Sequence, residues 1–86
     1  MLTIHVYGPG CANCRKLEEI ATKALADAGL EGEVLKVTEM AKIVEAGVLK
    51  TPGLAVNGKL VSYGRIPAPE SVLGWIREAK GEGGPA

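Results

Sequence analysis

The sequence of 86 residues contains no phenylalanine, and its aromatic side chains are limited to Tyr7, Tyr63 and Trp75. A hydrophobic core must therefore be built from Val, Leu, Ile and Ala. Only two cysteines are present, Cys11 and Cys14, which excludes the several widely spaced disulfides typical of small secreted domains. A bridge between residues so close in sequence would close a very short loop and add little stability. Chemistry is the better explanation for this pair.

Net charge is also absent, because ten Lys and Arg residues balance ten Asp and Glu residues. The chain therefore lacks the basic footprint of a nucleic-acid-binding protein. No apolar run approaches the ~20 residues that span a membrane, and the first ten residues lack the charged start and apolar stretch of a secretion signal. We expect a soluble cytoplasmic monomer with neither nucleic acid nor membrane as a partner.

The pattern of apolar and turn-forming residues predicts seven elements in the order β-α-β-α-β-β-α. Strands are expected at 2–7, 33–37, 54–56 and 60–63, and helices at 11–28, at 38–46 and after Pro67 and Pro69. Thr38 is a candidate N-cap for the second helix. The pair Asn57-Gly58 between the last two strands is the strongest short-range signal for a hairpin.

This order predicts an α/β fold in a single domain. The first two strands should be parallel, with a right-handed crossover, and the last two should form an antiparallel hairpin. A four-stranded mixed sheet with helices on both faces follows. We assign residues 1–80 to this domain and residues 81–86 to a disordered tail.

The position of the two cysteines at the start of the first helix separates their roles. At ~100° per residue, the apolar stripe of this helix is centred roughly 50° from Cys14 and about 110° from Cys11. Cys11 should therefore be accessible, and backbone N–H groups near the helix start should lower the pKa of its thiol below about 8.5. Cys14 should be shielded and placed to resolve a mixed disulfide. Two ordinary buried cysteines, or a zinc site with His5, are the alternatives, although structural zinc usually has four ligands.

The segment Gly8-Pro9-Gly10-Cys11-Ala12-Asn13-Cys14 after a strand, and the later segment from Thr51 to Lys59, resemble the thioredoxin superfamily. The resemblance is to its small, glutaredoxin-sized redox-active disulfide proteins of bacteria and archaea. It implies the thioredoxin-like fold and a protein disulfide oxidoreductase without a cofactor, with Cys11 as nucleophile and Cys14 as resolving thiol. It also implies that Pro52 is a cis-proline facing the disulfide and that Thr51 offers its backbone to substrate. Pro52 could instead simply start an edge strand, which proline favours.

The resemblance also bears on partners and on His5. The Gly-Gly-x-Asp signature with which glutaredoxins hold glutathione is replaced by Gly64-Arg65-Ile66-Pro67, so a thioredoxin-reductase-type protein is the expected electron donor and protein disulfides are the expected substrates. Thioredoxins carry a buried acid six residues before the first cysteine, where this chain has His5. The match implies a proton-transfer role for His5, and packing within the strand is the alternative.

A soft-metal chaperone of the ferredoxin-like kind is the rival interpretation of the cysteine pair. Such domains also place Cys-x-x-Cys between a first strand and a first helix, and two thiolates can bind Cu(I). Their element order is β-α-β-β-α-β, however, and it ends in a strand. The predicted final helix and the Thr51-Pro52 pair favour the oxidoreductase.

Overall fold

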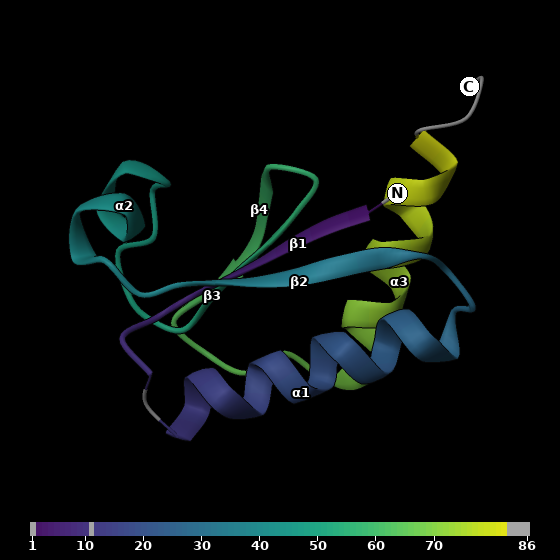
Figure 1. The fold of residues 1–86 in the computed structure, drawn as a ribbon, viewed down its shortest axis with the longest axis horizontal. Coiled ribbons are helices and arrows are strands. Elements are labelled where there is room, and N and C mark those ends of the chain that lie inside the picture. Colours follow the sequence, from purple (N-terminus) through teal and green to yellow (C-terminus); the bar gives the residue numbers. More distant parts are fainter. Residues whose placement is uncertain (1, 11, 83–86) are drawn as a thin grey trace.

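The computed structural model describes residues 2–10 and 12–82. Its elements are β1 (Leu2–Tyr7), α1 (Ala12–Asp27), β2 (Gly32–Val37), α2 (Met40–Glu45), β3 (Gly53–Val56), β4 (Lys59–Tyr63) and α3 (Pro69–Glu82) (Figure 1). The order β-α-β-α-β-β-α predicted from the sequence is therefore confirmed. No helix in these described ranges is long and apolar enough to cross a membrane.

The four strands form one mixed sheet in the order β2-β1-β3-β4. β1 is parallel to β2 and antiparallel to β3, so that Ile4 lies between Val34 and Val56. Helices α1 and α3 lie on one side of the sheet, and α2 lies beyond the opposite side, near one end (Figure 1). The expected α/β fold with a four-stranded mixed sheet is confirmed.

Alternation along β1 places the main core on the α1 and α3 side of the sheet. Leu2, Ile4 and Val6 are buried, and the residues between them are half-buried. The helices contribute aliphatic side chains at helical spacing, and Leu17 and Ile76 are fully buried. The core cluster consists of Leu2, Ile4, Val6, Leu17, Ala21, Ala24, Leu25, Leu54, Val56, Val72 and Ile76. This cluster contains no aromatic side chain, as the composition required.

The connection from α2 to β3 packs on the other face of the sheet. Gly53 pairs in register with Tyr7, and a Cβ atom added at Gly53 would lie 2.8 Å from Cγ1 and 2.9 Å from Cγ2 of Val48. Val48 is buried, as is Ile43 of α2. The absence of a side chain at Gly53 therefore lets this connection approach the start of β3.

The hairpin turn at Asn57 and Gly58 has the conformation that its sequence favours. Both residues have positive φ angles, 51° and 84°, as a two-residue type I′ turn requires. Asn57 is also joined to the start of β1: its Oδ1 accepts a hydrogen bond from the Thr3 amide at 3.0 Å, and its own amide donates to the Thr3 carbonyl at 2.8 Å. The turn thus fixes the register of the hairpin against β1.

Two predicted boundaries are wrong. Glu39, not Thr38, is the N-cap of α2, and it makes no side-chain capping bond. The reason is that β2 pairs through Val37, whose carbonyl accepts from the Gly8 amide at 2.9 Å, so the helix starts only after a short connection. In addition, α3 continues to Glu82, so residues 81 and 82 of the predicted tail are helical. Residues 83–86 of that tail lie outside the described residues.

Candidate functional site

Cys14 lies in the first turn of α1 and points into the molecule. Only 5% of it is exposed. Gly8 follows β1, on the same side of the sheet as Val6, and packs directly against Cys14. A Cβ atom added at Gly8 would overlap the Cys14 sulfur and lie 3.2 Å from Cys14 Cβ. The inward position predicted for Cys14 is therefore observed, and glycine at position 8 leaves the space that the sulfur occupies. The second predicted site residue of this pair, Cys11, lies outside the described residues.

Thr51 and Pro52 reach the same place from a distant part of the chain. A Cβ atom at Gly8 would lie 3.8 Å from Thr51 Cβ, so Gly8 is next to both Thr51 and Cys14. The Thr51-Pro52 peptide bond is cis, as the resemblance implied. Pro52 is buried, and its carbonyl accepts a hydrogen bond from the Gly64 amide at 2.9 Å. The end of β1, the start of α1 and the segment before β3 therefore meet at the end of the sheet away from the start of β1 (Figure 1).

His5 is not brought to this site. It alternates with Ile4 and Val6 along β1 and so faces the side of the sheet away from the main core. Its ring stacks on that of Tyr7, with centroids 5.9 Å apart and planes 21° apart. Its Nδ1 atom is buried and has no hydrogen-bond partner among the described residues. The sheet separates this ring from the contact between Gly8 and Cys14.

Three further residues lie close to Cys14, and the sequence analysis did not predict the cavity that they line. Arg15, Lys36 and Thr38 line a cavity of about 310 Å³ together with Cys14. Lys36 is opposite Val6 in the parallel pairing of β1 with β2. The position of Lys36 on the same face as Val6 could have been predicted from the pairing of β2 with β1, because residues paired in register share a face of the sheet.

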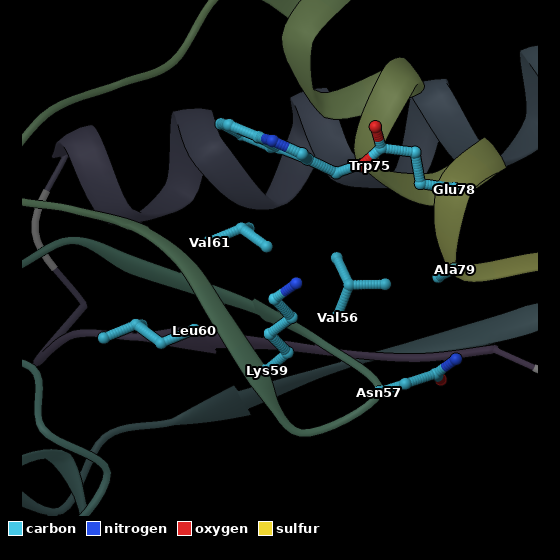
Figure 2. Close-up of a pocket in the computed structure, with 8 residues that line it drawn as sticks. All are labelled: Val56, Asn57, Lys59, Leu60, Val61, Trp75, Glu78 and Ala79. Carbon is cyan, nitrogen blue, oxygen red and sulfur yellow. The ribbon is translucent and has the colours of Figure 1, made fainter. Parts of the chain in front are cut away.

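A second cavity, of about 300 Å³, lies at the other end of the sheet. Trp75 and Glu78 of α3 face Val56 and Lys59 of the hairpin across it (Figure 2). It adjoins the turn residue Asn57, which bonds to the start of β1, whereas Gly8 follows the end of β1. The two cavities are therefore separate, and among the described residues a cysteine lines the first one and not the second.

Among residues 2–10 and 12–82, no three or more His, Cys, Asp or Glu side chains are grouped so that they could hold a metal ion. A strand leads through a Cys-x-x-Cys sequence into a helix, and a threonine that precedes a cis-proline lies next to Gly8, which contacts Cys14. Together with the strand order β2-β1-β3-β4, this arrangement defines the class of thioredoxin-fold proteins.

Comparison with known proteins identifies the family. The family model of the thioredoxin domain matches residues 2–77, and the chain belongs to this family. A thioredoxin of Methanothermobacter thermautotrophicus is 44% identical over 72 residues, which cover 84% of this chain and 94% of the relative. A thioredoxin of Methanocaldococcus jannaschii is 36% identical over 72 residues, which cover 84% of this chain and 83% of that relative.

A solved structure is similar at a lower level. A Nu-class GST from Haemonchus contortus aligns with 100% of this chain and with 40% of its own length, at 21% identity and a TM-score of 0.48. The assignment to the thioredoxin family therefore rests on the sequence matches and on the observed strand order.

Proposed function

We propose that this protein is a thiol–disulfide oxidoreductase that acts on protein disulfides, with Cys11 as the nucleophile and Cys14 as the resolving thiol. Membership in the thioredoxin family and two relatives named thioredoxin support an activity of this kind. The observation that carries the proposal is the contact of Cys14 with Gly8, beside Thr51. This contact places the shielded Cys14 sulfur at the start of α1 and next to the loop that contains Thr51.

The reaction is a two-electron exchange. The Cys11 thiolate attacks one sulfur of the substrate disulfide, forms a mixed disulfide and releases the other substrate sulfur as a thiolate. The Cys14 thiolate then attacks the Cys11 sulfur, which releases the second substrate thiolate and leaves a Cys11–Cys14 disulfide. Two electrons pass from the dithiol to the substrate, and solvent protonates the released thiolates. A thioredoxin-reductase-type protein would supply the electrons that restore the dithiol.

The backbone at Thr51 is proposed to hold the substrate. Thr51 is half-buried and adjoins Gly8, so an extended segment paired with its backbone would run past the cysteine pair. Main-chain hydrogen bonds of this kind bind extended peptides with little dependence on side chains. Such pairing suits an enzyme that accepts disulfides in different proteins.

The roles of the two cysteines are tested by substitution and trapping. Cys14→Ser should accumulate mixed disulfides with a substrate such as insulin, whereas Cys11→Ser should form none. Alkylation of the reduced protein near neutral pH should label Cys11 first, because an exposed thiol of lowered pKa reacts faster than a buried one. Faster labelling of Cys14 would reverse the assignment.

The proton-transfer role of His5 is tested with His5→Ala. If this variant resolves the mixed disulfide more slowly, and the pH dependence of the resolution rate changes, the role is supported. An unchanged pH dependence would exclude it.

The metal-chaperone alternative is tested with the wild-type protein in its reduced and oxidised forms. The reduced protein should reduce insulin, and its oxidised form should contain the Cys11–Cys14 bridge. A protein that shows no disulfide turnover, yet retains one Cu(I) ion against a strong competitor, would be a carrier instead. The observed final helix α3 supports the oxidoreductase, because a ferredoxin-like chaperone ends in a strand.

A further inference from the structure

The cavity beside Cys14 has its own walls, apart from the loop that is proposed to hold a peptide. It is lined by Val6, Gly8, Gly10, Cys14, Arg15, Lys36 and Thr38. These residues come from β1 and the loop after it, from the first turn of α1, and from β2 and the residue that follows it. Thr51 and Pro52 do not line it. A small molecule in this cavity would reach the Cys14 sulfur from the β2 side.

The charged side chains that line this cavity are both basic. Arg15 and Lys36 contribute two positive charges, and no Asp or Glu is among the described residues of its wall. One carboxylate partly balances them from outside: Glu18 Oε2 lies 3.7 Å from Lys36 Nζ. That distance exceeds the roughly 2.7–2.9 Å of a charge-assisted hydrogen bond, and 58% of the Lys36 side chain is exposed. Lys36 can therefore donate to another acceptor.

The donors around the cavity suit a carboxylate. Arg15 offers a planar fork of N–H groups, Lys36 an ammonium group, and Thr38 a hydroxyl that can donate as well. The volume of about 310 Å³ is near the lower limit of about 300 Å³ for ligand sites, so it suits a small molecule rather than a protein segment. A cavity lined by a cysteine and by two basic side chains fits a ligand that carries both a disulfide and an acidic group.

We propose that this cavity binds the carboxylate of a small disulfide substrate through Arg15 and Lys36. The proposal rests on the disulfide exchange proposed above and adds a class of substrate to it. In the balanced reaction, the Cys11 thiolate attacks the disulfide R–S–S–R, forms Cys11–S–S–R and releases one RS⁻. Cys14 then displaces the second RS⁻. The protein dithiol is oxidised to a disulfide, and the substrate is reduced to two thiols.

The test uses three symmetrical disulfides of similar size and different charge: dithiodipropionate, with two carboxylates; bis(2-hydroxyethyl) disulfide, which is neutral; and cystamine, with two ammonium groups. Each is mixed in excess with pre-reduced protein, and the second-order rate of dithiol loss is measured. The same rates with dithiothreitol correct for the intrinsic reactivity of each disulfide. After this correction, the dicarboxylate should react about tenfold faster than the neutral disulfide at low salt, as expected for charge-assisted hydrogen bonds.

Four single variants locate the effect. Arg15→Gln and Lys36→Gln should each lower the rate with dithiodipropionate by about three- to tenfold, and change the rate with the neutral disulfide less than about twofold. Glu18→Gln removes the competing carboxylate and should raise the dicarboxylate rate. Lys16→Gln is the matched control, because this neighbour of Arg15 carries the same charge but does not line the cavity. Raising the salt to about 0.5 M should reduce the preference.

Several results would overturn the inference. The inference would be wrong if the corrected rates with dithiodipropionate and with the neutral disulfide were equal. It would also be wrong if Lys16→Gln lowered the dithiodipropionate rate as much as Lys36→Gln, since a general positive field would then explain the data. If Arg15→Gln and Lys36→Gln slowed only the reduction of an acidic peptide disulfide, the partner would be a protein and not a small molecule. If the wild-type protein reduced neither insulin nor any of the three probes, the proposed function itself would fall. Reduction of insulin without charge preference would overturn the cavity proposal alone.

Discussion

Replacing Gly8 by alanine adds one methyl group at the most crowded point of the site. The new Cβ would overlap the Cys14 sulfur, lie 3.2 Å from Cys14 Cβ and contact Thr51 Cβ at 3.8 Å. Gly8 is not among the glycines with a positive φ angle, so alanine can adopt its backbone conformation. The effect of Gly8→Ala on the native state must therefore come from packing, chiefly against Cys14. Either the sulfur rotates away or the first turn of α1 moves.

The expected loss of stability follows from two opposing effects. Adding a methylene to a packed interior costs about 1–3 kcal/mol. Replacing glycine by alanine also restricts the unfolded chain, which returns about 0.4–1 kcal/mol. The net loss should lie between about 0 and 2.6 kcal/mol, with a middle value of about 1.3 kcal/mol that corresponds to a fall in Tm of roughly 5–10 °C for a domain of this size. Thermal unfolding of the reduced protein measures this directly.

The functional effect should appear in the second step of the exchange. A displaced Cys14 sulfur no longer lies in its native position for attack on the mixed disulfide, and a misplacement of about 1 Å can cost up to ~100-fold in rate. We expect resolution to slow at least about tenfold, while the first attack by Cys11 changes less. Release of the second thiol from a mixed disulfide, followed by quenched flow, measures the resolution rate.

Gly74→Ala serves as the control, because a Cβ atom there meets no atom within 4 Å. It lies within α3, where alanine in place of glycine should stabilise the helix by roughly 0.5–1 kcal/mol. If Gly8→Ala were as stable as Gly74→Ala, and resolved mixed disulfides at the wild-type rate, the close contact between Gly8 and Cys14 would not constrain the site. The reasoning would then be refuted.

Three further predictions concern the fold that positions the site, and each is checked by urea unfolding. Gly53→Ala should destabilise the fold by about 1–3 kcal/mol, because the added Cβ clashes with Val48. Adding Val48→Ala to the same chain should relieve part of that loss, and strictly additive effects of the two substitutions would contradict the contact. Asn57→Ala should cost about 1–2 kcal/mol, because alanine disfavours the positive φ angle and cannot accept from the Thr3 amide, whereas Asn57→Gly should cost less. Ile76→Ala should cost about 2–5 kcal/mol because it leaves a cavity in a fully buried part of the core, and a loss below about 1 kcal/mol would show that this core is loosely packed.

Much of the fold could be predicted because its signals are local. Asn57 and Gly58 favour positive φ angles, and the hairpin turn lies where they stand. The apolar spacing along α1 placed Cys14 on its buried side before any tertiary contact was known. Alternation along β1 likewise separated Ile4 and Val6 from His5. In each case the period of the backbone decides which side chains share a face.

The boundaries that failed were those controlled by partners far away in the sequence. Thr38 has a side chain suited to capping, yet α2 starts at Met40, because β2 is extended through Val37 by its pairing with β1. Capping preference is a weak local effect of about 1 kcal/mol. Pairing along a complete strand outweighs it, and a single sequence does not show where that pairing ends.

The sequence by itself determined the seven elements, their order, the inward side of Cys14 and the pairing of a dithiol motif with a Thr-Pro loop. Only the tertiary structure decided that Gly8 is next to both Cys14 and Thr51, that Lys36 shares a cavity with Cys14, and that the sheet separates His5 from the sulfur. The physical reason is range. Helix spacing and turn conformation depend on neighbours within a few residues, whereas these contacts join residues brought together only when α1 and the segment before β3 pack at the end of β1.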